Sequence, residues 1–144
     1  MRVLVVPLLA IVSGLAITLQ GQFMGLMDRA LGTKESAFIT YVSGGLLAAA
    51  LALILGISRL STTAGLPWYA YTSGALGLVI VATVGFVIPR LGAAKGFTLI
   101  LASQFLLAAL IDHFGLFGAA VRPLTASRVV GLGTLLASVW LVVR

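Results

Sequence analysis

Five long apolar runs, almost free of charge, limit the fold of this chain more than any other feature. They extend over residues 3–27, 36–57, 67–89, 94–111 and 125–143, approximately. A helix needs about 20 apolar residues to cross a bilayer, and each run is close to that length. We therefore predict an all-α integral membrane protein with five transmembrane helices, which form a single transmembrane domain over residues 1–144.

Composition excludes the soluble classes of protein. Charged residues make up 8% of the chain and the mean hydropathy is +1.23, whereas soluble domains are about 25% charged. A soluble enzyme, a nucleic-acid-binding module and a disordered chain are therefore ruled out. A β-barrel would need alternating apolar and polar residues, but runs such as Leu46–Ile57 and Leu76–Ile88 are continuous. A signal peptide after Arg2 is an alternative for the first run, but that run is long and four more follow it.

The basic residues are spread over the ends of the runs, one or two at each. Five spans would put Arg2, Arg59, Arg122 and Arg128 on the N-terminal side, here side A. Arg29, Lys34, Arg90, Lys95 and Arg144 would then lie on the other side, side B. Four against five gives no clear bias for the positive-inside rule. We hypothesise dual insertion and an antiparallel homodimer; one fixed orientation, set by charges near the first span or by a partner, is the alternative.

Several residue types needed for catalysis or metal binding are scarce. The chain has no cysteine and one histidine, which cannot build a zinc site. No glycine-rich nucleotide loop with a lysine occurs, and no nucleophile–base–acid arrangement is visible. We therefore predict no enzyme activity, no cofactor, no metal and no nucleic-acid partner; the partners expected are the lipid bilayer and a small-molecule substrate.

Four of the predicted spans carry polar side chains at a similar depth, roughly 9 to 14 Å from side B. These side chains are Gln20, Ser43, Thr83, Ser103 and Gln104. Polar groups are costly in lipid and tend to face protein or water, so this layer is predicted to line a substrate cavity. Hydrogen bonds within or between helices are the alternative, especially for the serines and the threonine.

Aromatic and acidic residues add further candidates. Tyr41 and Tyr71 lie deeper than the interfacial residues Trp68, Tyr69 and Trp140, so both tyrosines are predicted substrate contacts.

Asp112 ends the fourth span, where a carboxylate opposes the helix dipole. It is expected to have a cationic partner, Arg122, Arg59 or Arg128, either as a loop-fixing ion pair or as a gate that involves His113. Asp28 and Glu35 are predicted to lie in the first side-B loop.

Short segments along the whole chain resemble one known family. They are Leu19-Gln20-Gly21, Ser43-Gly44-Gly45, Pro89-Arg90-Leu91-Gly92-Ala93-Ala94, Ser103-Gln104, Asp112-His113-Phe114-Gly115-Leu116-Phe117-Gly118 and Arg122-Pro123. With five spans, the chain resembles the YdcZ-like family, a five-helix branch of the drug/metabolite transporter superfamily. One departure is Met24, which stands near a position where this family is expected to have asparagine.

The resemblance implies one inverted-repeat unit of a drug/metabolite transporter-like fold, because members of that superfamily commonly have ten helices or form dimers of smaller units. It implies a multi-pass protein of a bacterial-type inner membrane that moves a small organic solute by alternating access. We expect the protein to act as an antiparallel homodimer with dual topology. The alternatives are a non-transporting membrane subunit, and one half of a heterodimeric transporter with a related five-helix partner.

Overall fold

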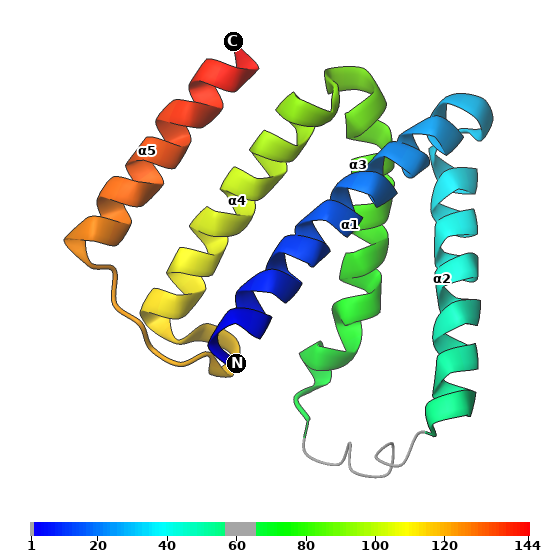
Figure 1. Cartoon of the computed structure of the whole chain (residues 1–144), viewed down its shortest axis with the longest axis horizontal. Coiled ribbons are helices and arrows are strands. Elements are labelled where there is room, and N and C mark those ends of the chain that lie inside the picture. The colour runs from blue at the N-terminus through cyan, green and yellow to red at the C-terminus, as the bar shows by residue number, and fades with distance from the viewer. Residues whose placement is uncertain (1, 57–65) are drawn as a thin grey trace. The chain divides into compact units, whose positions relative to one another are not determined.

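Five long helices make up most of the chain (Figure 1). The computed structural model describes residues 2–56 and 66–144, with side chains from residue 5 onward. The helices are α1 (Arg2–Leu31), α2 (Thr33–Leu55), α3 (Ser73–Leu91), α4 (Ala93–Phe114) and α5 (Ala126–Val143), with 3-10 turns η2 (Trp68–Thr72) and η3 (Leu116–Gly118). Within the described residues there is no strand, and five segments are long and apolar enough to cross a membrane. The predicted five-helix all-α fold class is confirmed.

The first side-B turn is shorter than the sequence predicts. α1 continues to Leu31 and α2 begins at Thr33, so a single glycine separates them. Gly32 has φ 100° and ψ 165°, a backbone region that is essentially restricted to glycine. The prediction that Asp28 and Glu35 lie in a loop is therefore wrong: Asp28 lies in the last turn of α1 and Glu35 in the first turn of α2.

Two compact units divide the described chain between Arg90 and Leu91. The first unit contains α1, α2, η2 and α3, and the second contains α4, η3 and α5. The prediction of one transmembrane domain over residues 1–144 stays a prediction.

Small residues let the helices of the first unit approach closely around Met24, which is 2% exposed. A Cβ atom on Gly85 of α3 would lie 3.3 Å from Met24 Cε, and one on Gly25 of α1 would lie 3.3 Å from Pro89 Cδ. The buried Ser36 hydroxyl donates a hydrogen bond of 3.1 Å to the Met24 carbonyl and so joins α2 to α1. Close packing of small residues is what holds helices together in lipid, where hydrophobic attraction between helices is weak.

The second unit is a helical hairpin that is tied at both ends. Near η3, the Arg122 N–H donates to the Asp112 carbonyl at 2.7 Å, and the Leu124 N–H donates to His113 Nδ1 at 3.1 Å. At the other end, Lys95 Nζ donates to the Val143 carbonyl at 3.0 Å, which satisfies one of the free carbonyls at the end of α5. These contacts fix α4 against α5 without a large buried core.

Candidate functional site

An open groove of about 610 Å³ lies between α1 and α2 in the first unit. Its walls are Ala16, Leu19, Gln20, Phe23, Met24 and Met27 of α1 and Ile39, Thr40, Ser43, Gly44 and Leu47 of α2. The spacing of three and four residues puts each set on one face of its helix. This α1–α2 groove brings together two of the residues predicted to contact substrate, Gln20 and Ser43.

Gln20 is the polar group of the groove that is available to a ligand. The Thr40 hydroxyl donates to the Ser36 carbonyl at 2.8 Å, and the Ser43 hydroxyl donates to the Thr40 carbonyl at 3.2 Å. Both hydroxyls are therefore satisfied within their own helix. The Gln20 amide makes no hydrogen bond to any residue of the described ranges 2–56 and 66–144, and an amide at membrane depth needs a polar partner.

The other predicted residues of the first unit lie away from this groove. The exposed Thr83 hydroxyl donates to the Val79 carbonyl of its own helix. Tyr41 faces α3 instead: its hydroxyl donates to the Gly74 carbonyl at 3.1 Å, and a Cβ atom on Gly77 would collide with that hydroxyl. Tyr71 lies in η2. The α1–α2 groove thus includes none of these three.

Ser103 and Gln104 lie on α4 of the second unit. The Ser103 hydroxyl donates to the Ile100 carbonyl of its own helix at 2.8 Å. Gln104 is exposed, and it is not among the residues that line the cavity between α4 and α5. The predicted layer that joins these two side chains to Gln20 and Ser43 stays a prediction.

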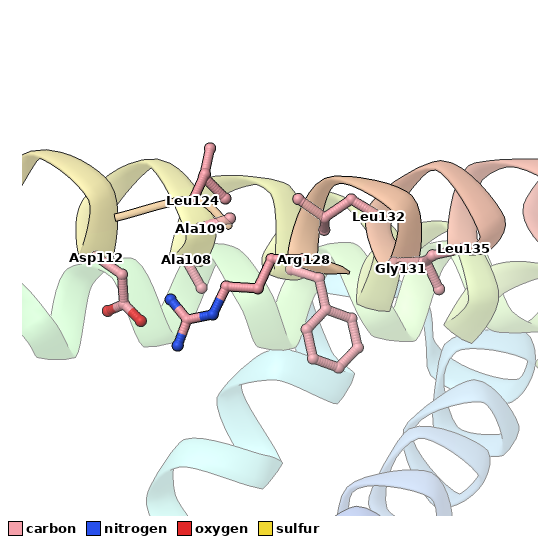
Figure 2. Close-up of a pocket in the computed structure, with 9 residues that line it drawn as sticks. Ala108, Ala109, Asp112, Leu124, Arg128, Gly131, Leu132 and Leu135 are labelled. Carbon is pink, nitrogen blue, oxygen red and sulfur yellow. The ribbon is translucent and has the colours of Figure 1, made fainter. Parts of the chain in front are cut away.

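A cavity of about 390 Å³ between α4 and α5 has Asp112 and Arg128 on its wall (Figure 2). Within the described part of the chain, Asp112 forms no ion pair; Arg122 reaches it through a backbone hydrogen bond to the Asp112 carbonyl. Arg59, another of the predicted partners, lies outside the described residues. The Leu124 N–H donates a hydrogen bond to His113 Nδ1. A gate at Asp112, His113 and Arg122 stays a prediction.

Sequence reasoning missed an ion pair between a buried carboxylate and a half-exposed arginine in the first unit. Arg90 Nη1 lies 2.9 Å from Asp28 Oδ2, and the Asp28 side chain is 3% exposed while that of Arg90 is 48% exposed. The Thr33 hydroxyl donates a short hydrogen bond to the other carboxylate oxygen of Asp28. The Arg90 guanidinium also stacks on the Phe86 ring, 3.5 Å from its centroid, which is a favourable cation–π position.

This cluster ties together the side-B ends of three helices. Asp28 comes from α1, Thr33 from α2 and Arg90 from α3. Arg29 adds a second link, because its Nη2 donates to the Pro89 carbonyl at 3.3 Å. The available signal was the scarcity of acids: with only three in the chain, each one next to an apolar helix is expected to have a cationic partner.

Comparison with known proteins assigns the chain to a family. The family model DMT_YdcZ, described as "Putative inner membrane exporter, YdcZ", matches residues 5–141. No curated protein and no solved structure matches the chain. The match reaches into all five spans and confirms the resemblance seen in the sequence, and the family description fits a multi-pass protein of the inner membrane. Because the family model matches nearly the whole chain, this protein belongs to the DMT_YdcZ family.

Proposed function

We propose that this protein exports a small organic solute by alternating access, as an antiparallel homodimer with dual topology. The observation that carries the proposal is the Gln20 amide, which lies without a described partner on the wall of an open groove in a member of an exporter family. Among the described residues that line this groove, none carries a charge. Recognition would therefore rest on the amide and on apolar contacts, which suits a small solute with a polar group and an apolar body.

A dimer supplies what one copy lacks. The α1–α2 groove is open, and three apolar residues on its wall, Leu19, Phe23 and Leu47, are 57%, 59% and 64% exposed. Many secondary transporters place their substrate sites between two repeats of opposite orientation. Two copies inserted in opposite orientations would provide such a pair of repeats from one five-helix chain.

Transport can be tested with the purified full chain in liposomes. The liposomes are loaded with an isotope-labelled bacterial metabolite extract, and the released solutes are identified by mass spectrometry. We expect the native chain to release a specific subset of solutes. Gln20→Leu is expected to lower that release at least tenfold, since among the described residues of the groove it removes the one amide side chain.

Gln22→Leu is the matched control. Gln22 lies on the same helix and is exposed, but it does not line the groove. This variant makes the identical chemical change, so it is expected to keep native release. Equal release from both variants would remove Gln20 from the substrate path. If the native chain released no more solute than loaded liposomes without protein, the transport proposal itself would be overturned.

A further inference from the structure

The α4–α5 cavity combines two opposite charges at one end with an apolar wall beyond them (Figure 2). Asp112 lies in the last turns of α4 and Arg128 in the first turn of α5. The rest of the wall consists of Phe105, Ala108, Ala109, Leu124, Gly131, Leu132 and Leu135. All of these residues belong to the second unit, so the cavity is complete within it.

The two charged side chains face one another in the cavity and remain separate. Figure 2 shows the Arg128 guanidinium and the Asp112 carboxylate pointing toward each other, but no ion pair joins them in the described structure. Arg128 Nη1 donates to the Arg122 carbonyl at 3.2 Å. The Asp112 carboxylate accepts no hydrogen bond from the residues that the structure describes.

Both charges lie at the helix end that disfavours them. A carboxylate is destabilised near a helix C-terminus, and a cation is destabilised near a helix N-terminus. Asp112 occupies the first situation and Arg128 the second. A ligand that brings one positive and one negative group would satisfy both side chains at once.

The apolar wall indicates that such a ligand also has a hydrocarbon part. Phe105 lies seven residues before Asp112 on α4, which is roughly 10 Å along the helix axis. Leu132 and Leu135 continue the apolar wall along α5, away from Arg128. The charged end is therefore at the edge of the span, and the apolar wall extends toward the interior of the membrane.

We propose that the α4–α5 cavity is a binding site for an aminophospholipid of the phosphatidylethanolamine class. The lipid phosphate contacts Arg128, whose guanidinium can bind phosphate through two hydrogen bonds. The primary ammonium donates to the Asp112 carboxylate, and one acyl chain lies against Phe105, Leu132 and Leu135. The site shares no lining residue with the α1–α2 groove and does not depend on the transport proposal.

The headgroup chemistry sets the expected selectivity. Phosphatidylcholine keeps the phosphate and a positive charge, but its quaternary ammonium has no N–H to donate to a carboxylate. Phosphatidylglycerol keeps the phosphate and has no cation for Asp112. Phosphatidylethanolamine alone among the three matches both side chains.

Binding can be measured on the full chain by native mass spectrometry, with equal amounts of palmitoyl-oleoyl phosphatidylethanolamine, phosphatidylcholine and phosphatidylglycerol in the detergent micelles. We expect one tightly held phosphatidylethanolamine per chain, with at least tenfold preference over the other two lipids. Asp112→Asn is expected to abolish the preference over phosphatidylcholine, and Arg128→Gln is expected to weaken binding of all three lipids. Equal retention of the three lipids by the native chain would overturn the proposal.

Two glycines on α5 provide a matched test of the cavity itself. A Cβ atom would meet nothing within 4 Å at either Gly131 or Gly133, but only Gly131 lines the cavity. Gly131→Leu would fill the apolar part and is expected to lower lipid retention at least tenfold, whereas Gly133→Leu keeps it. Gly131→Ala, a smaller change, is expected to give an intermediate loss. Native retention by Gly131→Leu would place the lipid elsewhere.

Soluble phosphoethanolamine distinguishes a lipid site from a site for a water-soluble zwitterion. It carries the same two charged groups without the acyl chains. We expect a thousandfold excess to displace little bound lipid, because the apolar contacts are missing. Displacement as efficient as that by phosphatidylethanolamine would overturn the lipid assignment.

Discussion

The Asp28 carboxylate is held by two donors, Arg90 and Thr33, at the junction of three helices. Asp28→Asn would remove the charge and leave Arg90 without its counter-ion. Loss of one partner costs about 3–5 kcal/mol in a fully buried pair and about 1 kcal/mol or less in an exposed pair. Because Asp28 is buried and Arg90 is half exposed, we expect a loss of about 2 kcal/mol, seen as a lower apparent melting temperature in detergent.

Glu35→Gln is the control for this prediction. Glu35 is an exposed acid on the first turn of α2, and it forms no ion pair within the described ranges. The same acid-to-amide change should leave the melting temperature nearly unchanged. Asp28→Asn combined with Arg90→Gln should be less than additive, since both changes remove one interaction. Equal effects of Asp28→Asn and Glu35→Gln would mean that the ion pair adds nothing to stability.

At the site, sequence could place side chains in depth but could not show their partners. Gln20 and Ser43 share a groove because equal depth on two adjacent antiparallel helices brings residues together. The local hydrogen bonds of Ser43, Thr83 and Ser103 match the alternative that serine and threonine satisfy themselves within a helix. Asp28 and Arg90 are 62 residues apart, and their pairing depends on how α1 and α3 pack, which no local pattern records.

At the scale of the element, the turn between α1 and α2 depends on Gly32. Its φ of 100° and ψ of 165° are readily adopted only by glycine, and a Cβ atom there would also lie 3.1 Å from Glu35 Oε2. We expect Gly32→Ala to cost about 1–3 kcal/mol and to lower the apparent melting temperature. Gly14→Ala is the control: Gly14 lies within α1 with open space around it, so alanine should stabilise the helix by up to about 1 kcal/mol. Equal effects of both changes would contradict the strain at Gly32.

The helices themselves were predictable, and their ends were less so. Length and continuous apolar composition fix a membrane helix, and the five predicted runs correspond to the five apolar segments of the structure. Charges at residues 28, 29, 34 and 35 resembled a loop, because a polar cluster between two apolar runs usually forms one. The structure shows instead that one glycine turns the chain and that these charges lie on helical turns. The apolar pattern indicates where a helix leaves the lipid. The helix itself can continue beyond that point, as α1 and α2 do here.

At the scale of the whole molecule, the distribution of basic residues bears on orientation in the membrane. The basic residues divide four to five between the two sides of the predicted topology, and only a clear excess selects one orientation. The apolar faces of the described helices are largely exposed, with no more than 17% of any span window buried. Such faces suit contact with lipid and with a second copy, which an antiparallel dimer requires.

Because the chain has no cysteine, single cysteines report orientation without background. Ala30→Cys lies on the exposed side-B end of α1, and Ala120→Cys lies in the exposed side-A segment before α5. With an impermeant thiol reagent on intact cells, we expect each site to react in about half of the molecules, and the remainder to react after lysis. Adding Ala94→Lys and Arg122→Ala changes the number of basic residues from four on side A and five on side B to three on side A and six on side B. Side B should then remain in the cytoplasm, so labelling of intact cells should shift strongly toward Ala120→Cys. A site that is always labelled in the unbiased chain, with the other never labelled, would show a single orientation and exclude the antiparallel homodimer, which leaves an oppositely oriented partner as the source of the second repeat.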